Sequence, residues 1–414
     1  MTDSAQTPPK GTGPLARREA RLAWGLLFPT LFIVSLVVIL PLLSIFWISF
    51  KPIGLAELRP VAPVLREDLR NSGDPDQAVR YRLQNRSQDT PIEDVAFTDT
   101  IPQGATLGSL PDQCTLQDST LTCVIGTLPP SERLTLTIPI AFDGDADLLE
   151  SRLEDETEAV ATGTAESILT NAEFTLENFA RVFDGSEFWG VLGVTLFYTV
   201  FGTVGALLFG LFAAMLLNKS FRGQGFLRGL FLFPYVAPVI AVAFTWVNLF
   251  DPFSGSVNAL LIQMGVTQEA INFFGQRPLA LIMVTVFEIW RYFPLSFLFI
   301  LARMQSIDQS MYEAADMDGA SPFQKFWFLS LPQLLGILSV LFLLRFIWTF
   351  NKFDDIFLLT GGNAGTRTLT VNVYEQAFAI SNIGAGAAVA VVIFGCLLIF
   401  SILFFRFISR EEGL

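Results

Sequence analysis

The sequence predicts an all-α polytopic membrane protein with a small β-sandwich inserted between its first two membrane spans. The chain of 414 residues is 52% hydrophobic with a mean hydropathy of +0.52, and only 16% of its residues are charged. An average soluble domain carries about 25% charged residues. Acidic residues gather in one stretch, since residues 51–185 hold 24 Asp and Glu against 10 Lys and Arg, whereas the remainder is nearly neutral. This asymmetry separates a water-facing insert from a lipid-facing remainder.

Six segments are long and apolar enough to cross a bilayer, which requires about 20 mostly apolar residues. The first three are uncharged runs of 29, 31 and 22 residues, which lie between Arg21 and Lys51, between Glu187 and Lys219, and between Arg228 and Asp251. The other three are residues 278–302, interrupted by Glu288 and Arg291, residues 334–351, interrupted by Arg345, and the uncharged residues 383–405. The chain therefore divides into residues 1–50 with the first span, an insert at 51–173, and a membrane core at 174–414.

The positions of Lys and Arg near the span ends predict the orientation. Four groups of basic residues share one side if there are six spans: Lys10, Arg17, Arg18 and Arg21; Lys219, Arg222 and Arg228; Arg303 and Lys325; Arg406 and Arg410. This side is expected to be the cytoplasm, which places both termini inside and the insert 51–173 outside, in the periplasm.

The insert shows strand patterns. Residues 79–83 and 134–138 alternate between apolar and polar side chains, and turn residues stand at 102–104 and 129–131. Short strands at this spacing predict a small β-sandwich. Cys114 and Cys123 lie in this external segment, where the compartment is oxidising, so we expect a disulfide between them; two reduced thiols are the alternative. Cys396 falls in the sixth span and is interpreted as an apolar residue.

Part of the insert resembles the immunoglobulin-like repeat of bacterial surface proteins. The resemblance rests on Asn85, residues 97–104 (FTDTIPQG), Cys114 and residues 123–129 (CVIGTLP), although Pro130-Ser131 stands where that repeat usually has a glycine turn. It implies a fold and no activity. Further on, Asp143, Asp145, Asp147 and Glu154 have the spacing of a calcium loop, but Leu148 occupies its glycine position. We interpret residues 143–170 as an acidic linker and a flexible or helical stalk.

Several classes of function are excluded. The chain has no His and three Cys, so it has no His-based catalytic triad, no His metal site and no thiolate zinc cluster. Its net charge of −13 argues against nucleic-acid binding. No G-x-x-x-x-G-K-[ST] nucleotide loop is present. We therefore expect a non-enzymatic protein without a metal or cofactor of its own.

The loop between the fourth and fifth spans, residues 303–332, contains a helix–turn–helix pattern. Glu313, Ala314 and Ala315 favour a helix, and Gly319 permits a tight reversal. Ser321-Pro322 can start a second helix, and Leu331-Pro332 marks the start of the fifth span. An ordinary amphipathic helix is the alternative interpretation.

The spacing of this loop resembles the signature of the membrane subunits of binding-protein-dependent ABC importers, and the flanking sequence is similar to the maltose-type sugar permeases. Supporting stretches are residues 178–179, 233–238, 317–322 and 350–362, although Asn363 and Ala364 replace the usual proline after Gly361-Gly362. Across residues 15–50 and 174–408, the resemblance implies an ABC type I importer permease fold. It also implies a loop that docks on a cytosolic ATPase pair through Glu313, Ala314, Ala315, Gly319 and Pro332. The implied partners are a second permease subunit, an external solute-binding protein and a sugar.

Charged residues inside spans usually face protein or a water-filled cavity. Glu288 and Arg291 share a helix face and can pair. Arg345, Trp348, Thr349 and Lys352 form one stripe, whose donors and aromatic ring suit sugar hydroxyls and pyranose rings. By resemblance, the candidate substrate pathway comprises Arg291, Tyr292, Leu295, Arg345, Trp348, Thr349 and Lys352. These charges can alternatively be structural ion pairs with the second permease.

The expected substrate is a disaccharide or α-glucoside. Three basic residues in the candidate pathway leave open a phosphorylated polyol or sugar acid. A membrane-anchored adhesion or receptor protein is a further class, which predicts a plain anchor rather than six spans with charges inside them.

Overall fold

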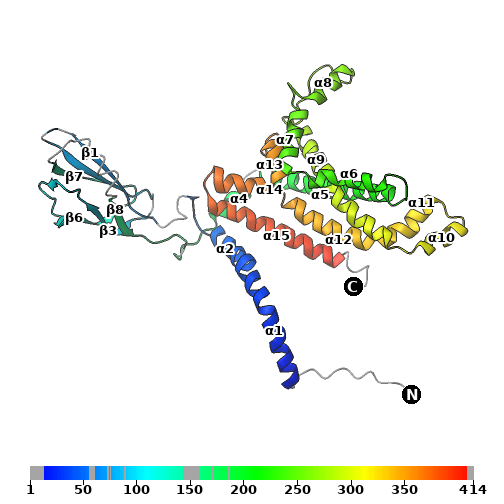
Figure 1. Ribbon diagram of the computed structural model, residues 1–414, viewed down its shortest axis with the longest axis horizontal. Helices are drawn as coiled ribbons and strands as arrows, with labels where there is room; N and C mark the ends of the chain where they lie inside the picture. Colours follow the sequence, from blue (N-terminus) through cyan, green and yellow to red (C-terminus); the bar gives the residue numbers. More distant parts are fainter. Residues whose placement is uncertain are drawn as a thin grey trace. The chain divides into compact units, whose positions relative to one another are not determined.

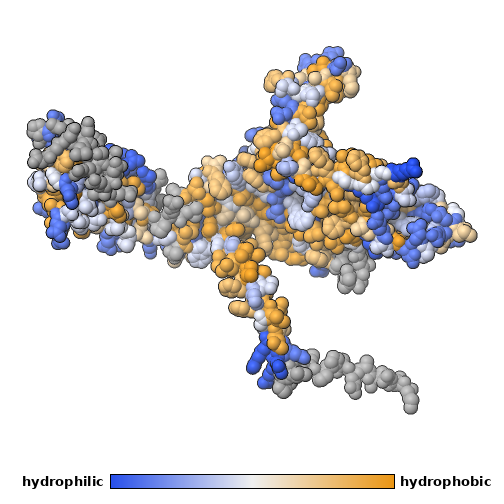
Figure 2. Space-filling model, viewed as in Figure 1, coloured by the Kyte–Doolittle hydropathy of each residue, from blue (hydrophilic) through white to orange (hydrophobic). Residues whose placement is uncertain are grey.

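The computed structural model describes residues 14–55, 61–71, 74, 76–87, 90–142, 149, 159–169, 171–184 and 187–407. The chain forms two compact units. The helical unit comprises residues 1–50 and 176–414, and the β unit comprises residues 51–175. Figure 2 shows hydrophobic residues over the long helices and more hydrophilic ones over the strands.

The helical unit is built from the following elements: α1 (Pro14–Val34), η1 (Ser35–Ile39), α2 (Leu40–Ser49), α4 (Glu177–Asp184), α5 (Phe188–Leu217), α6 (Gln224–Val236), α7 (Val239–Leu249), α8 (Ser256–Gln263), α9 (Leu279–Gln305), α10 (Gln309–Met317), α11 (Pro322–Lys325), η3 (Phe326–Ser330), α12 (Leu331–Phe350), α13 (Asp354–Thr360), α14 (Leu369–Tyr374), η4 (Glu375–Ala379) and α15 (Ile383–Phe407). Helices α5, α6, α9, α12 and α15 form a bundle, with α10 and α11 at one end and α13 and α14 at the other (Figure 1).

Five continuous helical stretches of the described chain are long and apolar enough to span a membrane: Arg17–Ser49, Phe188–Leu217, Leu279–Gln305, Pro322–Phe350 and Ile383–Arg406. They correspond to the first, second, fourth, fifth and sixth predicted spans. The third predicted span is not one straight helix, because α6 and α7 meet at an angle of 89°. The break falls at Pro238, which has no N–H to donate and excludes the helical conformation from Ala237, whose ψ is 143°.

Helices α5 and α9 pack closely because α5 presents small side chains to α9. A methyl group on Gly202, Gly205 or Gly210 would lie within 3 Å of Glu288, Ile289 or Ser296, respectively. Buried Ala206, Ala213 and Ala214 continue this face. Inside a membrane, the hydrophobic effect does not drive helices together, because lipid tails are as apolar as the side chains. Small residues allow two helix backbones to approach closely, so that van der Waals contacts hold them together.

The helix that contains the fifth predicted span begins before that span. The helix runs without interruption from Pro322 to Phe350, so Leu331-Pro332 lies inside it rather than at its start. Just before Pro332, residues Phe326–Ser330 form a π-helical turn in which the N–H of Leu331 bonds to the carbonyl of Phe326. A widened turn accommodates a proline that cannot donate its own hydrogen bond.

The β unit contains two four-stranded antiparallel sheets that share one hydrophobic core, with orders β1-β2-β7-β4 and β5-β6-β3-β8. The strands are β1 (Val64–Arg70), β2 (Ala78–Gln84), β3 (Ile92–Thr100), β4 (Ala105–Leu107), β5 (Cys114–Gln117), β6 (Thr120–Leu128), β7 (Arg133–Phe142) and β8 (Val160–Thr164). The two segments predicted from alternation are confirmed as parts of β2 and β7, which pair with each other.

Further expectations concern the stalk, the calcium-loop spacing, the disulfide and the immunoglobulin-like repeat of this unit. The predicted stalk is wrong for residues 160–164, because these form β8 and pair with β3. Asp143, Asp145, Asp147, Leu148 and Glu154, the residues of the calcium-loop spacing, lie outside the described residues. Cys114 and Cys123 stand directly opposite each other on β5 and β6 and are joined by a disulfide. The likeness to an immunoglobulin-like repeat remains a prediction.

Polar side chains also lie in the core between the two sheets. Asn85 is fully buried and donates to the carbonyls of Thr90, Leu128 and Pro129, so it holds the β2–β3 and β6–β7 connections together. The hydroxyl of Tyr81 donates to Asp99 of the opposite sheet. Glu67 takes the inward position between Leu65 and Leu69 on β1. Burial, and secondarily the charge of Asp99, raises the pKa of Glu67 to about 8.

Candidate functional site

Glu288 of α9 is the centre of a buried polar network that joins three helices. Its Oε1 accepts hydrogen bonds from Arg345 Nη2 at 2.7 Å and from Thr349 Oγ1 at 2.9 Å, both on α12. Its Oε2 accepts one from the Tyr198 hydroxyl of α5 at 3.1 Å. All four side chains are buried. The network is possible because Gly202 of α5 leaves room for the Glu288 side chain, whose Cγ would lie 2.9 Å from an added Cβ.

The expected pairing of Glu288 with Arg291 is wrong. Arg291 instead donates from Nη1 to the carbonyl of Pro234 at 3.1 Å and from Nη2 to the carbonyl of Ala237 at 3.0 Å. Pro238 interrupts the helical hydrogen bonds at this point, so both carbonyls lie where the bend leaves acceptors without helical donors. Arg291 therefore holds the α6–α7 bend, and Glu288 is left for Arg345.

Three basic side chains of the candidate pathway lie over the aromatic ring of Tyr292. The distances to the ring centroid are 4.5 Å for Lys352 Nζ, 4.8 Å for Arg345 Cζ and 5.6 Å for Arg291 Cζ. Tyr235 of α6 packs edge-on against the same ring, with centroids 6.1 Å apart. Lys352 Nζ also lies 3.2 Å from Asp354 and 3.8 Å from Asp355. Five of the seven pathway residues predicted from the sequence thus come together: Arg291, Tyr292, Arg345, Thr349 and Lys352.

The other two pathway residues supply none of the hydrogen bonds or cation–ring contacts of this network. Trp348 is 53% exposed, because it points away from the face of α12 that carries Arg345 and Thr349. Leu295 is half-buried on α9. Sequence reasoning missed Tyr198, Tyr235 and Asp355. Asp355 is fully buried, and both its carboxylate oxygens lack a hydrogen-bond partner among the described residues. Its place in an acidic pair beside Lys352 was the available signal.

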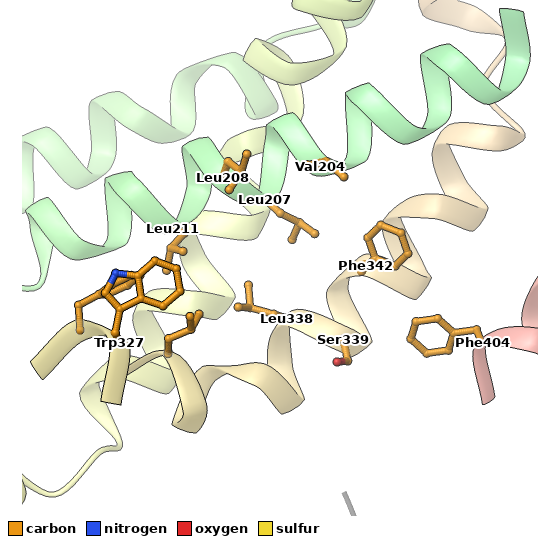
Figure 3. Close-up of a pocket in the computed structure, with 11 residues that line it drawn as sticks. Val204, Leu207, Leu208, Leu211, Trp327, Leu338, Ser339, Phe342 and Phe404 are labelled. Carbon is orange, nitrogen blue, oxygen red and sulfur yellow. The ribbon is translucent and has the colours of Figure 1, made fainter. Parts of the chain in front are cut away.

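Two hollows in the helical unit differ in chemistry. A polar cavity of about 600 Å³ lies between the start of α5, the α8–α9 connection and the α13–α14 loop, and its lining includes Glu187, Arg277, Asn363 and Arg367. Gly362 and Gly365 in that loop have positive φ. An apolar groove of about 520 Å³ lies between α5, the η3–α12 helix and α15 (Figure 3). Ser339 supplies its one side-chain hydroxyl, so this groove lacks the polar groups that a sugar requires.

Residues 303–332 contain the predicted helix–turn–helix, although its second helix continues into the helix of the fifth predicted span. Asp308 caps α10 by accepting from the N–H of Ser310, and Gly319 ends that helix with a φ of +76°. The N–H of Ala320 bonds to the carbonyl of Ala315, and that of Gly319 to Asp316, which is the Schellman arrangement. Ser321 and Gln324 form a reciprocal capping box at the start of α11, with Pro322 in its first turn.

Contacts within the loop fix the two short helices relative to each other. Lys325 of α11 pairs with Asp316 of α10 at 2.5 Å, and the hydroxyls of Tyr312 and Ser330 lie 2.9 Å apart. Glu313, Ala314 and Pro332 are exposed, and Ala315 is half-buried. Met317 and Phe323 are 89% and 71% exposed. The loop is thus a preformed projection with exposed apolar and acidic side chains at the end of the bundle (Figure 1).

The other groups that could hold a ligand are few. Within the described ranges, no three acidic or cysteine side chains come together as a metal site would require. The two cysteines of the β unit are bonded to each other, and Cys396 is half-buried beside the aromatic cluster of α12 and α15.

A multi-pass membrane protein with a buried network of charges and a projecting helical loop has the features of a transport subunit rather than those of a simple anchor. The comparisons with known proteins identify which kind. The chain belongs to the family of binding-protein-dependent transport system inner membrane components, whose profile matches residues 206–411. It is a multi-pass inner membrane protein and the permease subunit of an ABC transporter, not an enzyme.

Curated proteins that are similar to this chain include ABC permeases. The chain is 36% identical over 229 residues to the inner membrane ABC transporter permease protein YcjO of Escherichia coli, covering 55% of this chain and 76% of YcjO. It is 32% identical over 232 residues to the trehalose/maltose transport system permease protein MalF of Thermococcus litoralis, covering 56% and 78%. It is 32% identical over 242 residues to the sn-glycerol-3-phosphate transport system permease protein UgpA of Salmonella typhimurium, covering 57% and 80%.

A solved structure supports the fold. A chain of a bacterial alginate ABC transporter, in complex with an alginate pentasaccharide-bound periplasmic protein, superposes with a TM-score of 0.54 at 18% identity, covering 57% of this chain and 83% of that one. The helical unit therefore has the ABC type I importer permease fold. The profile match at 206–411 does not include the β unit.

Proposed function

We propose that this permease subunit belongs to an ATP-driven importer of neutral sugars, in the size range of a disaccharide or α-glucoside. The proposal rests on the pairing of the three basic side chains around Tyr292, which are Arg291, Arg345 and Lys352. Each has a partner within the chain, so none of the three offers an unpaired positive charge to an anionic substrate.

The three partners differ in kind. Arg345 is paired with Glu288, and both side chains are at most 3% exposed. Arg291 is engaged by two backbone carbonyls. Lys352 faces the carboxylates of Asp354 and Asp355. An anionic substrate binds most strongly where guanidinium or ammonium groups are available to it. Around Tyr292 an anion would instead meet three carboxylates that already balance the bases.

The relatives favour two candidate substrates. Thermococcus litoralis MalF carries trehalose and maltose in its name, and Salmonella typhimurium UgpA carries sn-glycerol 3-phosphate. The internal pairing of the three bases favours the neutral sugar. The phosphorylated polyol or sugar acid is the second candidate, and Arg277, an exposed basic residue in the lining of the polar cavity, is the observation in its favour.

Transport by such a subunit requires partners that supply energy and substrate. We propose that α10 and α11 dock on a cytosolic ATPase dimer, with Glu313, Ala314, Ala315 and Gly319 shaping the contact and Pro332 at its base. A second permease subunit completes the pathway, and a solute-binding protein delivers the sugar from outside. In this arrangement both termini are cytoplasmic and the β unit is periplasmic. Closure of the ATPases would move the loop and open the pathway alternately to either side.

The test is a reconstitution of the permease with its second permease, ATPase and binding protein in proteoliposomes. ATP hydrolysis is measured with maltose, trehalose or sn-glycerol 3-phosphate as the ligand of the binding protein. We expect a neutral disaccharide to stimulate hydrolysis. Stimulation by sn-glycerol 3-phosphate and by neither disaccharide would refute the proposal and establish the second candidate.

A matched pair of variants tests the role of Tyr292. Tyr292→Phe retains the ring, and Tyr292→Ala removes it. We expect the KM for the sugar to rise about tenfold in Tyr292→Ala, equivalent to about 1.4 kcal/mol, and to change little in Tyr292→Phe. If both variants have the same KM as the unsubstituted permease, Tyr292 does not belong to the pathway.

A further inference from the structure

The β unit has one strongly basic face, although the stretch of chain that contains it is acidic. The five arginines in its strands all belong to one sheet: Arg66 and Arg70 on β1, Arg80 and Arg82 on β2, and Arg133 on β7. Their strand neighbours Leu65, Leu69, Val79, Tyr81, Leu83 and Leu134 point into the shared core. Because side chains alternate along a strand, all five arginines point outward from the same side of the sheet.

The pairing register concentrates these charges. Arg66 stands directly opposite Arg82, and Asp68 directly opposite Arg80. Asp68 accepts hydrogen bonds from both Arg80 and Arg82, and it is the one acidic residue on this side of the three strands. Arg66, Arg70 and Arg133 are exposed and form no ion pair with any described residue. Like charges placed directly across strands destabilise a sheet unless something neutralises them.

We propose that this arginine face, defined as Arg66, Arg70, Arg80, Arg82 and Arg133, binds the anionic phospholipid headgroups of the membrane in which the helical unit is embedded. The guanidinium groups of Arg66, Arg70 and Arg133, which form no ion pair with a described residue, match a plane of phosphodiesters, because each can donate two parallel hydrogen bonds to phosphate. The threonines on the same side, Thr135 and Thr137, are uncharged and allow close approach.

The short connections to the helical unit favour the lipid surface over other anionic partners. Residues 50–63 separate α2 from β1, and residues 165–176 separate β8 from α4. Each connection can extend to at most about 50 Å. The β unit is thus tethered covalently to a membrane-embedded unit, which gives headgroups a high effective concentration around it. The acidic remainder of the unit is repelled by the same surface, so the arginine face alone sets the orientation.

The proposal is tested on the full chain in nanodiscs. Cys396 is replaced by Ala, and a single cysteine carrying an environment-sensitive fluorophore is placed at Thr135, beside Arg82 in the sheet register, or at Thr98, on the outer side of the other sheet. Quenching by neutral acrylamide is compared between nanodiscs of phosphatidylcholine and nanodiscs of phosphatidylcholine and phosphatidylglycerol in equal parts. We expect phosphatidylglycerol to lower quenching at Thr135 about twofold, high salt to restore it, and Thr98 to stay unchanged.

Two triple variants separate charge from folding. Replacing Arg66, Arg70 and Arg133 by Gln should abolish the protection at Thr135, and replacing the same three by Lys should retain most of it. Quenching at Thr135 that is identical in the two nanodiscs for the unsubstituted arginine face would overturn the proposal without any variant. Protection at Thr135 in phosphatidylcholine nanodiscs by soluble polygalacturonate, with none from phosphatidylglycerol, would also overturn it and assign the face to an acidic polysaccharide.

Discussion

Glu288 on α9 and Arg345 on α12 form a salt bridge of 2.7 Å in which the two side chains are 1% and 3% exposed. The same carboxylate also accepts hydrogen bonds from Thr349 and Tyr198, so one acidic group joins three helices of the bundle. A charge inside a span is stable only when a partner compensates it. This pair is therefore a structural feature of the permease as well as part of its candidate pathway.

Breaking the pair on one side should destabilise the protein more than removing both charges. Glu288→Gln or Arg345→Met alone leaves a buried charge without a counter-ion, which costs about 3–5 kcal/mol. The double variant removes both charges and should lose less than the sum of the two. A double-mutant cycle of thermal stability in detergent measures this coupling. Additive losses would contradict the role given to the pair.

The close approach of α5 and α9 should make Gly202 intolerant of any side chain. In Gly202→Ala, the added methyl group meets Glu288 Cγ at 2.9 Å, so we expect a loss of about 1–3 kcal/mol although alanine is the better helix former. Gly193→Ala on the same helix is the matched control, because no described atom lies within 4 Å of its added Cβ. Equal stability of the two variants in a thermal shift assay would refute the proposed packing.

Arg291 should act mainly on the α6–α7 bend. Arg291→Met leaves the carbonyls of Pro234 and Ala237 without donors, and each unsatisfied buried acceptor costs about 1–3 kcal/mol. We expect faster amide hydrogen exchange in residues 233–242, with or without sugar. Unchanged exchange together with a raised KM would instead make Arg291 a substrate ligand.

The β unit should lose stability as the pH rises. The pKa of Glu67 is raised from 4.5 to about 8 in the folded state, so between these values the folded unit binds a proton that the unfolded chain releases. The stabilisation is complete below pH 4.5 and is lost as the pH rises through 8. We expect the separately expressed unit, residues 51–175, to melt several degrees lower at pH 9 than at pH 5; about 1 kcal/mol corresponds to 4–8 °C.

Two carboxyl-to-amide variants test the source of that dependence. Glu67→Gln should flatten the pH profile, because the side chain no longer has a proton to lose. Glu93→Gln, which changes an exposed carboxyl on β3, should leave the profile as it is. A profile that is the same in all three proteins would exclude Glu67 as the titrating group.

Hydropathy and alternation predicted most of the architecture because each depends on local sequence. Long, mostly uncharged runs predicted the long helices. The alternation at 79–83 and 134–138 predicted two strands, which pair with each other. The exceptions occur at prolines. Pro238 divides the third span although the apolar run continues through it, and Pro332 does not end the helix at 322–350, because a π-helical turn accommodates it. The π-helical turn at Pro332 depends on hydrogen bonds that composition does not reveal.

Partners across helices and strands were less predictable. Glu288 and Arg291 are three residues apart, which made them obvious partners, but Glu288 pairs with Arg345, 57 residues further along the chain. The arginines of the β unit were visible at alternate positions in the sequence. Their grouping on one face follows from the register that places Arg66 opposite Arg82. Local spacing therefore predicts which residues share a face, and packing decides what that face meets.

The central claim is that the 303–332 loop connects this permease to its ATPase, and co-purification tests it most directly. Gly319 adopts a φ of +76° in a Schellman turn with open space around it, so Gly319→Val strains the turn without a steric clash. Glu313→Lys reverses an exposed charge on α10. With both substitutions, we expect normal amounts of permease in the membrane and at least about tenfold less ATPase retained, equivalent to about 1.4 kcal/mol. Undiminished retention of the ATPase, with uptake intact, would contradict the claim.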